Sequence, residues 1–600
     1  RPPRSTHCIS SAASDVYKRQ AHHCFNRPQE GDIHYWIDET IRFCDVLFTE
    51  DLGIDPMEIS YVENPWSGGG NAGPAVEVIV GGLELATLVF MNLKEDETGD
   101  VEIKGVRYSE MPLQIIDTGY GLERFCWAAA GTPTIYEAIY PETVSWLREL
   151  SSFDELLSTL GDVDVDLLLA ELSRLAGILN IDVGTDVDAL YVRLIERLSE
   201  RNVSLDVATL KSITEPLSSI YAIPDHMHAL CNMLNDGLVP SNAKAGYLAR
   251  MMARRACRMK DDLGLTIGLD EIGAHHIDVN LSGSIEPKSR QNILTILALE
   301  ELRYREMLRA GQAAVRTALK DIPSDANKVP SEILFRLAEE RGLQPEMVVS
   351  IAYEAGWPNV TVPVGFAADM AARHAEQVRM LAKRKGGDGT GLGAGHPATI
   401  RSFYDDTAAV QFDAKVISCI EGIDAISTGS ESLGNATHAI VLDRTLFYPE
   451  GGGQLSDHGV LSDGSTSVRV VDVQIDGDVI LHLTDGPLAT GSVQGEIDWS
   501  RRKQLMDHHT AVHIVGGAAR QILGDHIWQA GSNKGARYAR LDITHHSRLK
   551  REVIDSIEDL ANEVVASSPT VEKLLIPRAE ADSRFGFELY QGGPPKHSEI

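Results

Sequence analysis

The sequence contains three short stretches whose residue types and spacing can do chemistry. The first is DTGYGLER, which runs from Asp117 to Arg124. Its glycines, Gly119 and Gly121, allow a backbone to turn tightly and to approach a ligand closely. The guanidinium of Arg124 can stack on a base or pair with a phosphate. A glycine-rich turn before a helix is often only a turn, so the pattern alone leaves both interpretations open.

The second stretch is the densest group of positive charges in an acidic chain. Arg250, Arg254 and Arg258 are four residues apart, which places their side chains on one face of a helix. Such a row of cations suits the phosphate backbone of an RNA. A solvated helix face without a ligand explains the same spacing, and that alternative stays open.

The third stretch is HHTAVH. His509 and His513 are four residues apart in an apolar helical context, so both imidazoles project from one face, one turn apart. This spacing suits two ligands of one zinc ion. A histidine pair at this spacing is more often not a metal site, so the neighbouring sequence has to decide. His508 is interpreted as a neighbour and not as a ligand.

The hydrophobic pattern predicts the elements that carry the first stretch. Residues 76–93 form an apolar run interrupted by Gly-Gly and predict two buried strands joined by a turn. Residues 117–131 predict the end of a strand and a glycine turn that leads into a helix. DTGYGLER is therefore expected where a strand passes into a helix.

The pattern then changes along the chain. Residues 149–385 are almost wholly helical in pattern, and the arginine row lies in a helix expected to start near Ser241, a suitable N-cap. GGDGTGLGAGHP predicts a flexible linker. Residues 401–500 alternate short apolar runs with Gly and Asp turns, which is typical of a small antiparallel barrel, and residues 501–600 mix helix and strand.

Composition excludes several classes of protein. With 55 Lys and Arg against 87 Asp and Glu, the net charge of −32 argues against non-specific nucleic-acid binding, because phosphate neutralisation needs clustered cations. The seven cysteines are scattered and none forms a CxxC pair, so no disulfide framework is expected. No apolar run approaches about 18 residues, which argues against a membrane protein. A cytoplasmic enzyme is the expectation.

Several segments together resemble the archaeal-type alanyl-tRNA synthetases, which belong to class II of the aminoacyl-tRNA synthetases. DTGYGLER with its continuation GTPTIYEAIYPE is similar to their third signature motif, AHHCFN to the tail of the second, and ENPWSGGGNAGPAVEVIVGGLELATLVFMNLKED to their alanine pocket. The resemblance implies that Trp66 walls the pocket, that Thr87 faces it from a strand and that Asp117 pairs with the ammonium of alanine. Taken alone, Trp66 would be interpreted as a core tryptophan. The other residues implied for alanine and ATP are Gly119, Gly121 and Arg124, and the candidate catalytic residues here are Asp117 and Arg124.

The arginine row lies in a segment that resembles the tRNA-recognition domain of the same family. There the asparagine of a PSN motif contacts the G·U wobble pair of the acceptor stem, and Asn242 inherits this role by position. An amide suits the contact because it both donates and accepts hydrogen bonds. Glu339 stands where the family has an aspartate for the same contact. The expected tRNA-binding set is completed by Arg250, Arg254 and Arg258.

The histidine pair lies in a segment that resembles the editing domain of the family. FYPEGGGQLSDHG, GDHIWQAGSNK and ARLDITHH carry this resemblance. It implies that His509 and His513 are two zinc ligands, and that two further ligands, a cysteine and a histidine spaced CxxxH, are expected beyond residue 600. Gln529 occupies the position of a glutamine in the editing motif and is the candidate catalytic residue there. Gln454, in the triple-glycine loop, is expected to shape the pocket.

The expected fold is a multidomain α+β protein. It combines part of a class II catalytic domain built on an antiparallel sheet, an all-α tRNA-recognition domain, a small β-barrel and an α+β editing domain. Residues 1–20 resemble a translated sequencing adaptor, with a disordered tail as the alternative. The other expected divisions are 21–148 for the catalytic domain, 149–385 for tRNA recognition, 386–400 for the glycine-rich linker, 401–500 for the barrel and 501–600 for an incomplete editing domain.

The resemblance implies an alanine-tRNA ligase. ATP and Mg²⁺ would activate alanine, tRNA(Ala) would receive it, and a pocket that cannot strongly reject glycine or serine would require hydrolytic editing of mischarged tRNA. The first class II motif is expected before residue 21, so the 600-residue chain alone is not expected to charge tRNA; a homo-oligomer would form through a C-terminal region. Two alternatives stay open. A trans-editing deacylase would not need DTGYGLER, and a catalytically inactive tRNA-binding protein would be expected to lack Asp117, Arg124 or His513.

Overall fold

The computed structural model describes most of the chain. The described residues are 19–160, 167–171, 187–201, 203–241, 244–323, 325–341, 343, 345–363, 366, 373, 392–421, 436–572, 574–589 and 600. The chain forms two compact units, Arg1–Asp369 and Met370–Ile600. Within the described residues, no helix is both long enough and apolar enough to cross a membrane.

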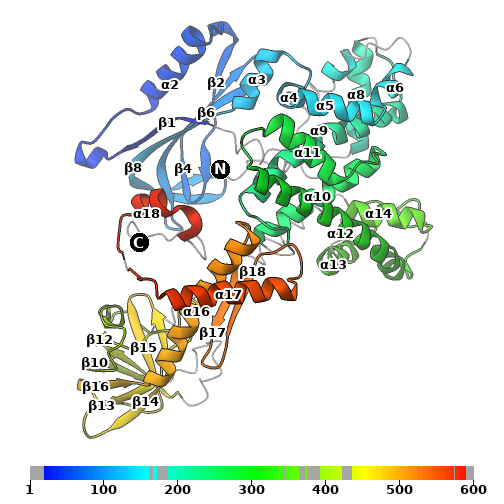
Figure 1. Cartoon of the computed structure of the whole chain (residues 1–600). Helices are drawn as coiled ribbons and strands as arrows, with labels where there is room; N and C mark the ends of the chain where they lie inside the picture. The colour runs from blue at the N-terminus through cyan, green and yellow to red at the C-terminus, as the bar shows by residue number, and fades with distance from the viewer. Residues whose placement is uncertain are drawn as a thin grey trace. The chain divides into compact units, whose positions relative to one another are not determined.

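The first unit contains an eight-stranded sheet, blue in Figure 1. Its strands are β1 (Arg19–Asn26), β2 (Ile59–Glu63), β3 (Trp66–Gly68), β4 (Asn71–Gly73), β5 (Ala75–Val80), β6 (Leu83–Glu95), β7 (Val101–Ile103) and β8 (Val106–Tyr120). The main path runs β1-β8-β6-β4-β3, β5 pairs with both β6 and β2, and β7 pairs with β8. The pairings are antiparallel, which confirms the kind of sheet that the sequence predicts.

The hairpin of β5 and β6 forms because two glycines close it. Gly81 and Gly82 have φ angles of 55° and 90°, in the left-handed region that glycine adopts without steric cost. The predicted pair of strands around the Gly-Gly turn is therefore confirmed. At the other edge, β1 includes Arg19 and Gln20, which pair with the end of β8, so the sheet extends two residues before the expected start at residue 21.

Alternation along β6 and β8 gives the sheet two different faces. Leu88 and Phe90 point to one face and belong to a core to which helix α2 (Ile37–Val46) also contributes. Val89 points to the opposite face, together with its cross-strand neighbour Asp117. One face is thus closed by a helix, and the other carries the candidate ligand-binding residues.

DTGYGLER spans the end of β8 and the start of α3 (Leu122–Ala130). The strand continues through Gly119 to Tyr120, and the turn consists of Gly121 alone. Gly121 precedes the helix with a φ of −79°, and its N–H donates to the carbonyl of Leu85 at 2.9 Å. The predicted strand-to-helix junction is confirmed. Pairing with β6 keeps Gly119 extended, so Gly121 forms the predicted glycine turn.

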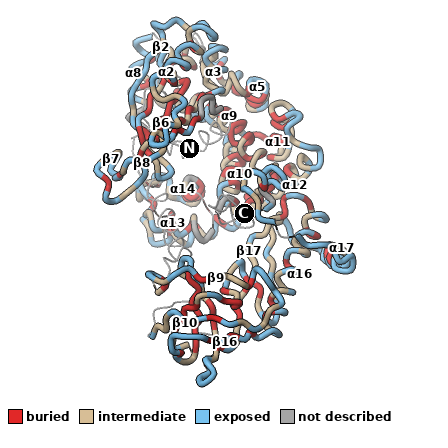
Figure 2. The backbone as a smooth tube through the Cα atoms, turned by 90° about the vertical axis from the view of Figure 1, so that its left-hand side faces the viewer, coloured by how far each residue is buried: buried red, intermediate tan, exposed pale blue. Residues whose placement is uncertain are grey.

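Beyond α3 the described part of the first unit is mostly helical. The helices are α4 (Ile135–Ile139), α5 (Pro141–Leu150), α6 (Phe153–Ser158), α8 (Val187–Glu200), α9 (Val207–Asn235), α10 (Lys244–Asp262), α11 (Leu269–Asn280), α12 (Pro287–Leu319), α13 (Ser331–Arg341) and α14 (Pro345–Glu354). Figure 2 shows buried residues along α9 and α10, where they belong to one continuous core. Helix α10 is described from Lys244 onward, and Asn242, next to the predicted N-cap Ser241, lies outside the described residues.

The second unit contains a closed six-stranded barrel. Its strands are β10 (Gln411–Glu421), β11 (His438–Leu442), β13 (Gly459–Ser462), β14 (Ser467–Asp476), β15 (Val479–Thr484) and β16 (Gly491–Ile497). They close in the order β10-β11-β15-β14-β13-β16, with antiparallel pairing throughout. The predicted antiparallel barrel is confirmed. Beside it, β9 (Ile400–Arg401) and β12 (Arg444–Thr445) form a short parallel pair.

Helices and a hairpin follow the barrel in the second unit. HHTAVH lies in α16 (Trp499–Leu523), which packs on α17 (Arg551–Ser567). In the sequence between these two helices, β17 (Gln529–Lys534) and β18 (Ala539–Ile543) form an antiparallel hairpin, which also contacts α16. The last α-helix described is α18 (Arg578–Phe585), which is followed by a short 3-10 helix, η7 (Gly586–Leu589). The mixture of helix and strand predicted for this part is confirmed.

A buried ion pair joins the barrel to the start of α16. Asp457 is fully buried and Arg502 is 3% exposed. Arg502 Nε donates to both carboxylate oxygens of Asp457, at 3.0 and 2.8 Å, and its Nη2 donates to the carbonyl of Leu446 at 2.5 Å. The backbone N–H of Tyr448 donates to the same carboxylate at 2.6 Å. The two charges neutralise each other away from water and hold the helix on the barrel.

Arg502→Met should strongly destabilise the second unit. The substitution leaves the Asp457 carboxylate buried without its cation, which costs about 3–5 kcal/mol in the free energy of unfolding. Arg469→Met is the matched control, because Arg469 pairs with Asp485 while its own side chain is 69% exposed, and such pairs contribute at most about 1 kcal/mol. Urea unfolding followed by circular dichroism compares the two variants. Equal losses would contradict the role given to the buried pair.

Candidate functional site

Trp66, Thr87 and Asp117 lie on the same face of the eight-stranded sheet. Asp117 in β8 is directly opposite Val89 of β6, and Thr87 is directly opposite Gly119. Directly opposed residues in an antiparallel pair project to the same side. Trp66 belongs to the small apolar cluster that contains Val89. The structure thus brings together the three residues that the resemblance implies for the amino acid.

Trp66 is a buried residue that forms a wall of this cluster. It packs with Ala75, Val89 and Met91. Its indole ring lies over Gly68, where an added Cβ would come within 2.8 Å of the ring. Glycine at that position therefore lets the ring fold back onto its own hairpin. The packing agrees with a core tryptophan, and it also leaves the ring beside the face that carries Asp117.

Glu84 links Arg124 to Thr87. Arg124 Nη1 donates to the carbonyl of Glu84 at 2.8 Å and lies 3.2 Å from the Glu84 carboxylate. Thr87 Oγ1 donates to the other carboxylate oxygen. The guanidinium is therefore held at the start of β6, with 36% of the Arg124 side chain exposed. Sequence reasoning missed Glu84, because strand alternation places residues three apart on opposite faces, and here the register of β5 and β6 shifts between Glu84 and Ala86.

The arrangement places opposite charges along one side of the sheet. Asp117 and Gly119 are two residues apart, so the carboxylate and the Thr87 position are about 7 Å apart along the strand. An ammonium group can bind at the carboxylate, while the guanidinium of Arg124 can bind a phosphate. These charges match those of a zwitterionic amino acid and a nucleotide.

Arg250 is bound within the helical part of the first unit. Its Nε and Nη2 donate to the two carboxylate oxygens of Glu300 in α12, at 3.0 and 3.2 Å, and Nη2 also donates to the carbonyl of Pro240 at 2.9 Å. The Glu300 side chain is 1% exposed, and Arg303 lies 2.5 Å from it. This bidentate pair ties α10 to α12, so Arg250 has a structural contact in addition to its place in the arginine row.

The other members of the tRNA-binding set differ in how the structure places them. Arg254 is half-buried, and burial, followed by repulsion from Arg250, lowers the pKa of its guanidinium. Arg258 is partly buried, with Nε at 3.9 Å from the carboxylate of Asp262. The arginine row is therefore not a fully solvated helix face. Glu339 lies in α13, but its side chain lies outside the described part of the structure.

His509 and His513 lie one turn apart on α16. Their rings stack with centroids 5.2 Å apart and planes inclined by 17°. Burial lowers the pKa of both imidazoles, and the positive charge of Lys534 lowers it further. Neutral imidazole is the form that binds a metal ion. His508 pairs through Nδ1 with the carbonyl of Gly535 at 2.7 Å, which supports its interpretation as a neighbour.

Gln454 orients His509, and Lys534 holds the loop that carries Gln454. His509 Nδ1 lies 2.9 Å from Gln454 Oε1. An amide oxygen only accepts, so Nδ1 carries the proton and Nε2 keeps its lone pair for a ligand. Lys534 Nζ donates to the carbonyl of Gly452 at 2.6 Å and to Ser532 Oγ at 2.7 Å. The triple-glycine loop and β17 are thus fastened beside α16. Sequence reasoning missed Lys534, because the contact that fastens the loop is to Gly452, 82 residues away.

A cavity of about 210 Å³ is lined by residues of α16 and of the β17–β18 hairpin. His513 lines it from the helix, and Gln529 lines it from the hairpin together with Trp528. Gln529 Nε2 donates to Ser532 Oγ at 3.1 Å, which holds its amide in place. At about 30 Å³ per water molecule, the cavity can hold several waters or a small polar group. Two of the residues predicted for editing thus meet at one cavity.

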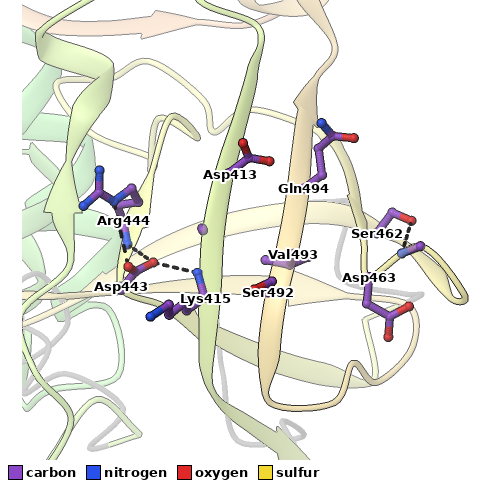
Figure 3. A pocket seen from close by; sticks show the side chains of 11 residues that line it. Asp413, Lys415, Asp443, Arg444, Ser462, Asp463, Ser492, Val493 and Gln494 are labelled. Atoms are coloured by element: carbon purple, nitrogen blue, oxygen red, sulfur yellow. Dashed lines mark hydrogen bonds and ion pairs between the residues drawn. The ribbon is translucent and has the colours of Figure 1, made fainter.

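A larger cavity of about 690 Å³ lies on the barrel surface (Figure 3). Within it, the Asp443 carboxylate accepts hydrogen bonds from the backbone N–H groups of Lys415 and Arg444 at 2.7 and 2.9 Å. Ser462 Oγ accepts from the N–H of Gly464 at 3.3 Å. These polar groups stabilise the turns of the barrel itself. None of the residues predicted for a functional site lines this cavity.

Comparison with known proteins shows the family to which the chain belongs. The family described as tRNA synthetases class II (A) matches residues 15–501. The chain belongs to this family. Its relatives include the alanine–tRNA ligases of Halorubrum lacusprofundi, 41% identical over 603 residues, of Natronomonas pharaonis, 40% identical over 597 residues, and of Methanosarcina mazei, 39% identical over 600 residues. These matches cover 98%, 97% and 97% of the chain.

This class II synthetase chain spans about three fifths of the length of those relatives, namely 61%, 61% and 60%. The family match includes the sheet, the helical part of the first unit and the barrel, and it ends at the start of α16. The histidine pair and the β17–β18 hairpin lie after the end of that match, but within the alignment to the alanine–tRNA ligases.

Lys534→Met should raise the pKa of both His509 and His513. Removing the nearby positive charge makes protonation of each imidazole less unfavourable, while burial, the larger cause, is unchanged. Titration of the imidazole signals by NMR, in protein free of metal, measures the shift. His482, which is buried in the barrel and hydrogen-bonded to Thr445 Oγ1 at 2.8 Å, is the internal reference and should not move. Unchanged or lowered values for the pair would refute the electrostatic role of Lys534.

Proposed function

We propose that the chain carries the alanine-activating, tRNA-recognising and editing parts of an alanine–tRNA ligase. The observation that carries the proposal is 41% identity, over 98% of the chain, to a protein of that name from Halorubrum lacusprofundi. The grouping of Trp66, Thr87 and Asp117 on one sheet face supports it independently, since an alanine site needs an anion, a small apolar wall and little else. We place the reaction in the cytoplasm.

In the first step, alanine binds with its ammonium group at Asp117 and its methyl group toward Trp66. Its carboxylate attacks the α-phosphorus of ATP, which forms alanyl-adenylate and releases pyrophosphate. Arg124, held by Glu84, offers its guanidinium to the negative charge that develops on the phosphate. Mg²⁺, when bound, neutralises charge on the leaving pyrophosphate. The terminal adenosine hydroxyl of tRNA(Ala) then attacks the carbonyl, and AMP leaves.

The helical part of the first unit is assigned to tRNA(Ala). Asn242 and Glu339 are the proposed contacts to the G·U pair, and Arg254 and Arg258 the proposed contacts to phosphate. Arg250 holds α10 against α12 through its contact with Glu300. We therefore propose that it positions the arginine row as well as contributing positive charge. An acidic chain needs such a local cluster to bind RNA.

The second unit is assigned to editing. A pocket that fits alanine also admits glycine and cannot strongly exclude serine, so hydrolysis of the mischarged tRNA is required for accuracy. The cavity that His513 and Gln529 share has room for a seryl or glycyl ester and several waters. We assign to Gln529 a hydrogen bond to the aminoacyl group.

His509 and His513 fit two ligands of a zinc ion. They project from one helix face, and Gln454 leaves Nε2 of His509 available. In the part of the chain that the structure describes, no third histidine, cysteine or carboxylate forms a cluster with this pair. We propose the remaining ligands, a cysteine and a histidine, outside that part. Zinc, when bound, would polarise the ester or the water that attacks it.

Asp117→Asn should reduce alanine-dependent exchange between ATP and pyrophosphate by about 100-fold, because a charge-assisted hydrogen bond to the ammonium contributes up to about 3 kcal/mol. The assay uses the chain joined to the parts of the Halorubrum lacusprofundi relative that the alignment leaves uncovered. Glu102→Gln, an exposed carboxylate in β7 of the same sheet, is the control and should leave exchange unchanged. Exchange that survives Asp117→Asn would exclude the proposed role of that residue. If the unsubstituted protein shows no exchange with any amino acid, the evidence shifts to trans-editing or to RNA binding without catalysis.

Gln529→Ala should slow the hydrolysis of Ser-tRNA(Ala) by about tenfold, because one hydrogen bond of about 1.4 kcal/mol is lost. Alanine activation should not change, since Gln529 lies in the other compact unit. Deacylation of labelled Ser-tRNA(Ala) measures the rate. Gln521→Ala, on an exposed position of α16, provides the matched control. Equal rates for the two variants would remove Gln529 from the editing site.

A further inference from the structure

Three histidines form a cluster apart from the sites described above. His526 follows α16, and His545 and His546 follow β18. One ring nitrogen of each lies within 4.8 Å of the others. His526 is buried, with 4% of its surface exposed, and the other two are partly buried. Among the described residues, this is the one group of three or more potential metal ligands at such spacing.

We propose that His526, His545 and His546 form a second transition-metal site, separate from the His509–His513 pair. Imidazole donors suit Zn²⁺, Cu²⁺ and Ni²⁺, whereas Mg²⁺ and Ca²⁺ require oxygen ligands that the cluster does not contain. Three protein ligands leave a fourth position for water or a substrate atom. This site does not depend on the proposed ligase activity.

The spacing of the three rings is close to what a metal ion requires. Zinc–nitrogen bonds of about 2.0–2.1 Å in a tetrahedron place two nitrogens about 3.3 Å apart. In the structure, His526 Nε2 and His545 Nδ1 are 2.8 Å apart, and the ring centroids of His545 and His546 are 4.3 Å apart. The ring torsion of histidine is soft, so small rotations are enough to reach the coordinating geometry.

The two segments that carry the cluster are held together without a metal. Thr544 Oγ1 donates to the carbonyl of His526 at 2.6 Å and accepts from the N–H of Trp528 at 2.7 Å. The N–H of Thr544 donates to the carbonyl of Trp528 at 2.9 Å. These bonds place the residues on either side of Thr544 and Trp528 before any ion arrives. Binding therefore orders little new structure and loses little entropy.

The protonation of the rings favours a metal over a proton. Burial, followed by the neighbouring rings, lowers the pKa of His526 to about 4, and burial also lowers the pKa of His545. Around His526, Asp525 opposes the shift and Arg520 adds to it. Ser547 Oγ lies 3.2 Å from His545 Nε2 and can accept its proton, which leaves Nδ1 with a lone pair for the ion. Neutral imidazole is the form that binds a metal ion.

The test removes the His509–His513 pair by substitution and measures how much zinc the chain still binds. The 600-residue chain with His509→Ala and His513→Ala is dialysed against Zn²⁺, freed of excess ion and analysed by elemental mass spectrometry. A single equivalent of zinc is expected to remain. Adding His546→Ala should weaken zinc binding by more than tenfold, because a direct ligand is lost. His34→Ala, an exposed histidine beside Asp32, is the matched control and should leave binding unchanged.

A second variant separates loss of the site from loss of the fold. His545→Gln removes a ligand but keeps a side chain that can hydrogen-bond to His526, and circular dichroism monitors the fold in every variant. With Co²⁺ in place of Zn²⁺, the site should give the visible absorption of a tetrahedral nitrogen-ligated ion, and His545→Gln should remove it. The proposal is overturned if the double variant retains no metal, or if folded His546→Ala and His545→Gln chains bind as tightly as their parent. Those outcomes would leave a hydrogen-bonded histidine cluster with a structural role.

Discussion

The pairing register of β6 with β8 is the constraint on which the amino-acid site depends. Asp117 lies opposite Val89 and therefore shares its face. Because side chains alternate with a period of two, a slip by one residue would turn Asp117 into the core that contains Leu88 and Phe90. A carboxylate there would lose its hydration among apolar side chains, at a cost of several kcal/mol. The apolar residues of the closed face thus hold the register, and the register in turn places a carboxylate on the open face.

Polar contacts fasten several parts of the second unit around its candidate site. Arg502 and Asp457 fasten α16 to the barrel, and Lys534 fastens the triple-glycine loop to β17. Gln454, on that loop, then fixes the proton of His509. Each of these buried groups has its partner, and a network of this kind is rigid because every broken contact leaves an unsatisfied polar atom. A loop of three glycines would otherwise be free to move.

The arginine row shows why residue type and spacing were not sufficient to describe a surface. The helical period correctly places Arg250, Arg254 and Arg258 on one side of α10. Packing decides whether that side faces solvent or a neighbouring helix. Here Glu300 of α12, 50 residues further along the chain, contacts Arg250 on that side. The guanidinium of Arg250 is consequently neutralised inside the protein. A count of cations along the sequence overstates the positive charge available to RNA.

The sequence by itself determined the local elements, because hairpins, amphipathic helices and alternating strands depend on residues that are near one another in the chain. The Gly-Gly hairpin, the strand-to-helix junction of DTGYGLER, the antiparallel barrel and the shared face of His509 and His513 all follow from such patterns. Which of the two glycines turns was decided by ladder pairing with β6, which keeps Gly119 extended and leaves the turn to Gly121. Only the tertiary structure decided which side chains contact one another across long separations in the chain. Burial and register bring such side chains together, and the residues next to them in the sequence do not indicate the contact. Those partners are Glu84 for Arg124, Glu300 for Arg250 and His545 for His526, at separations of 40, 50 and 19 residues.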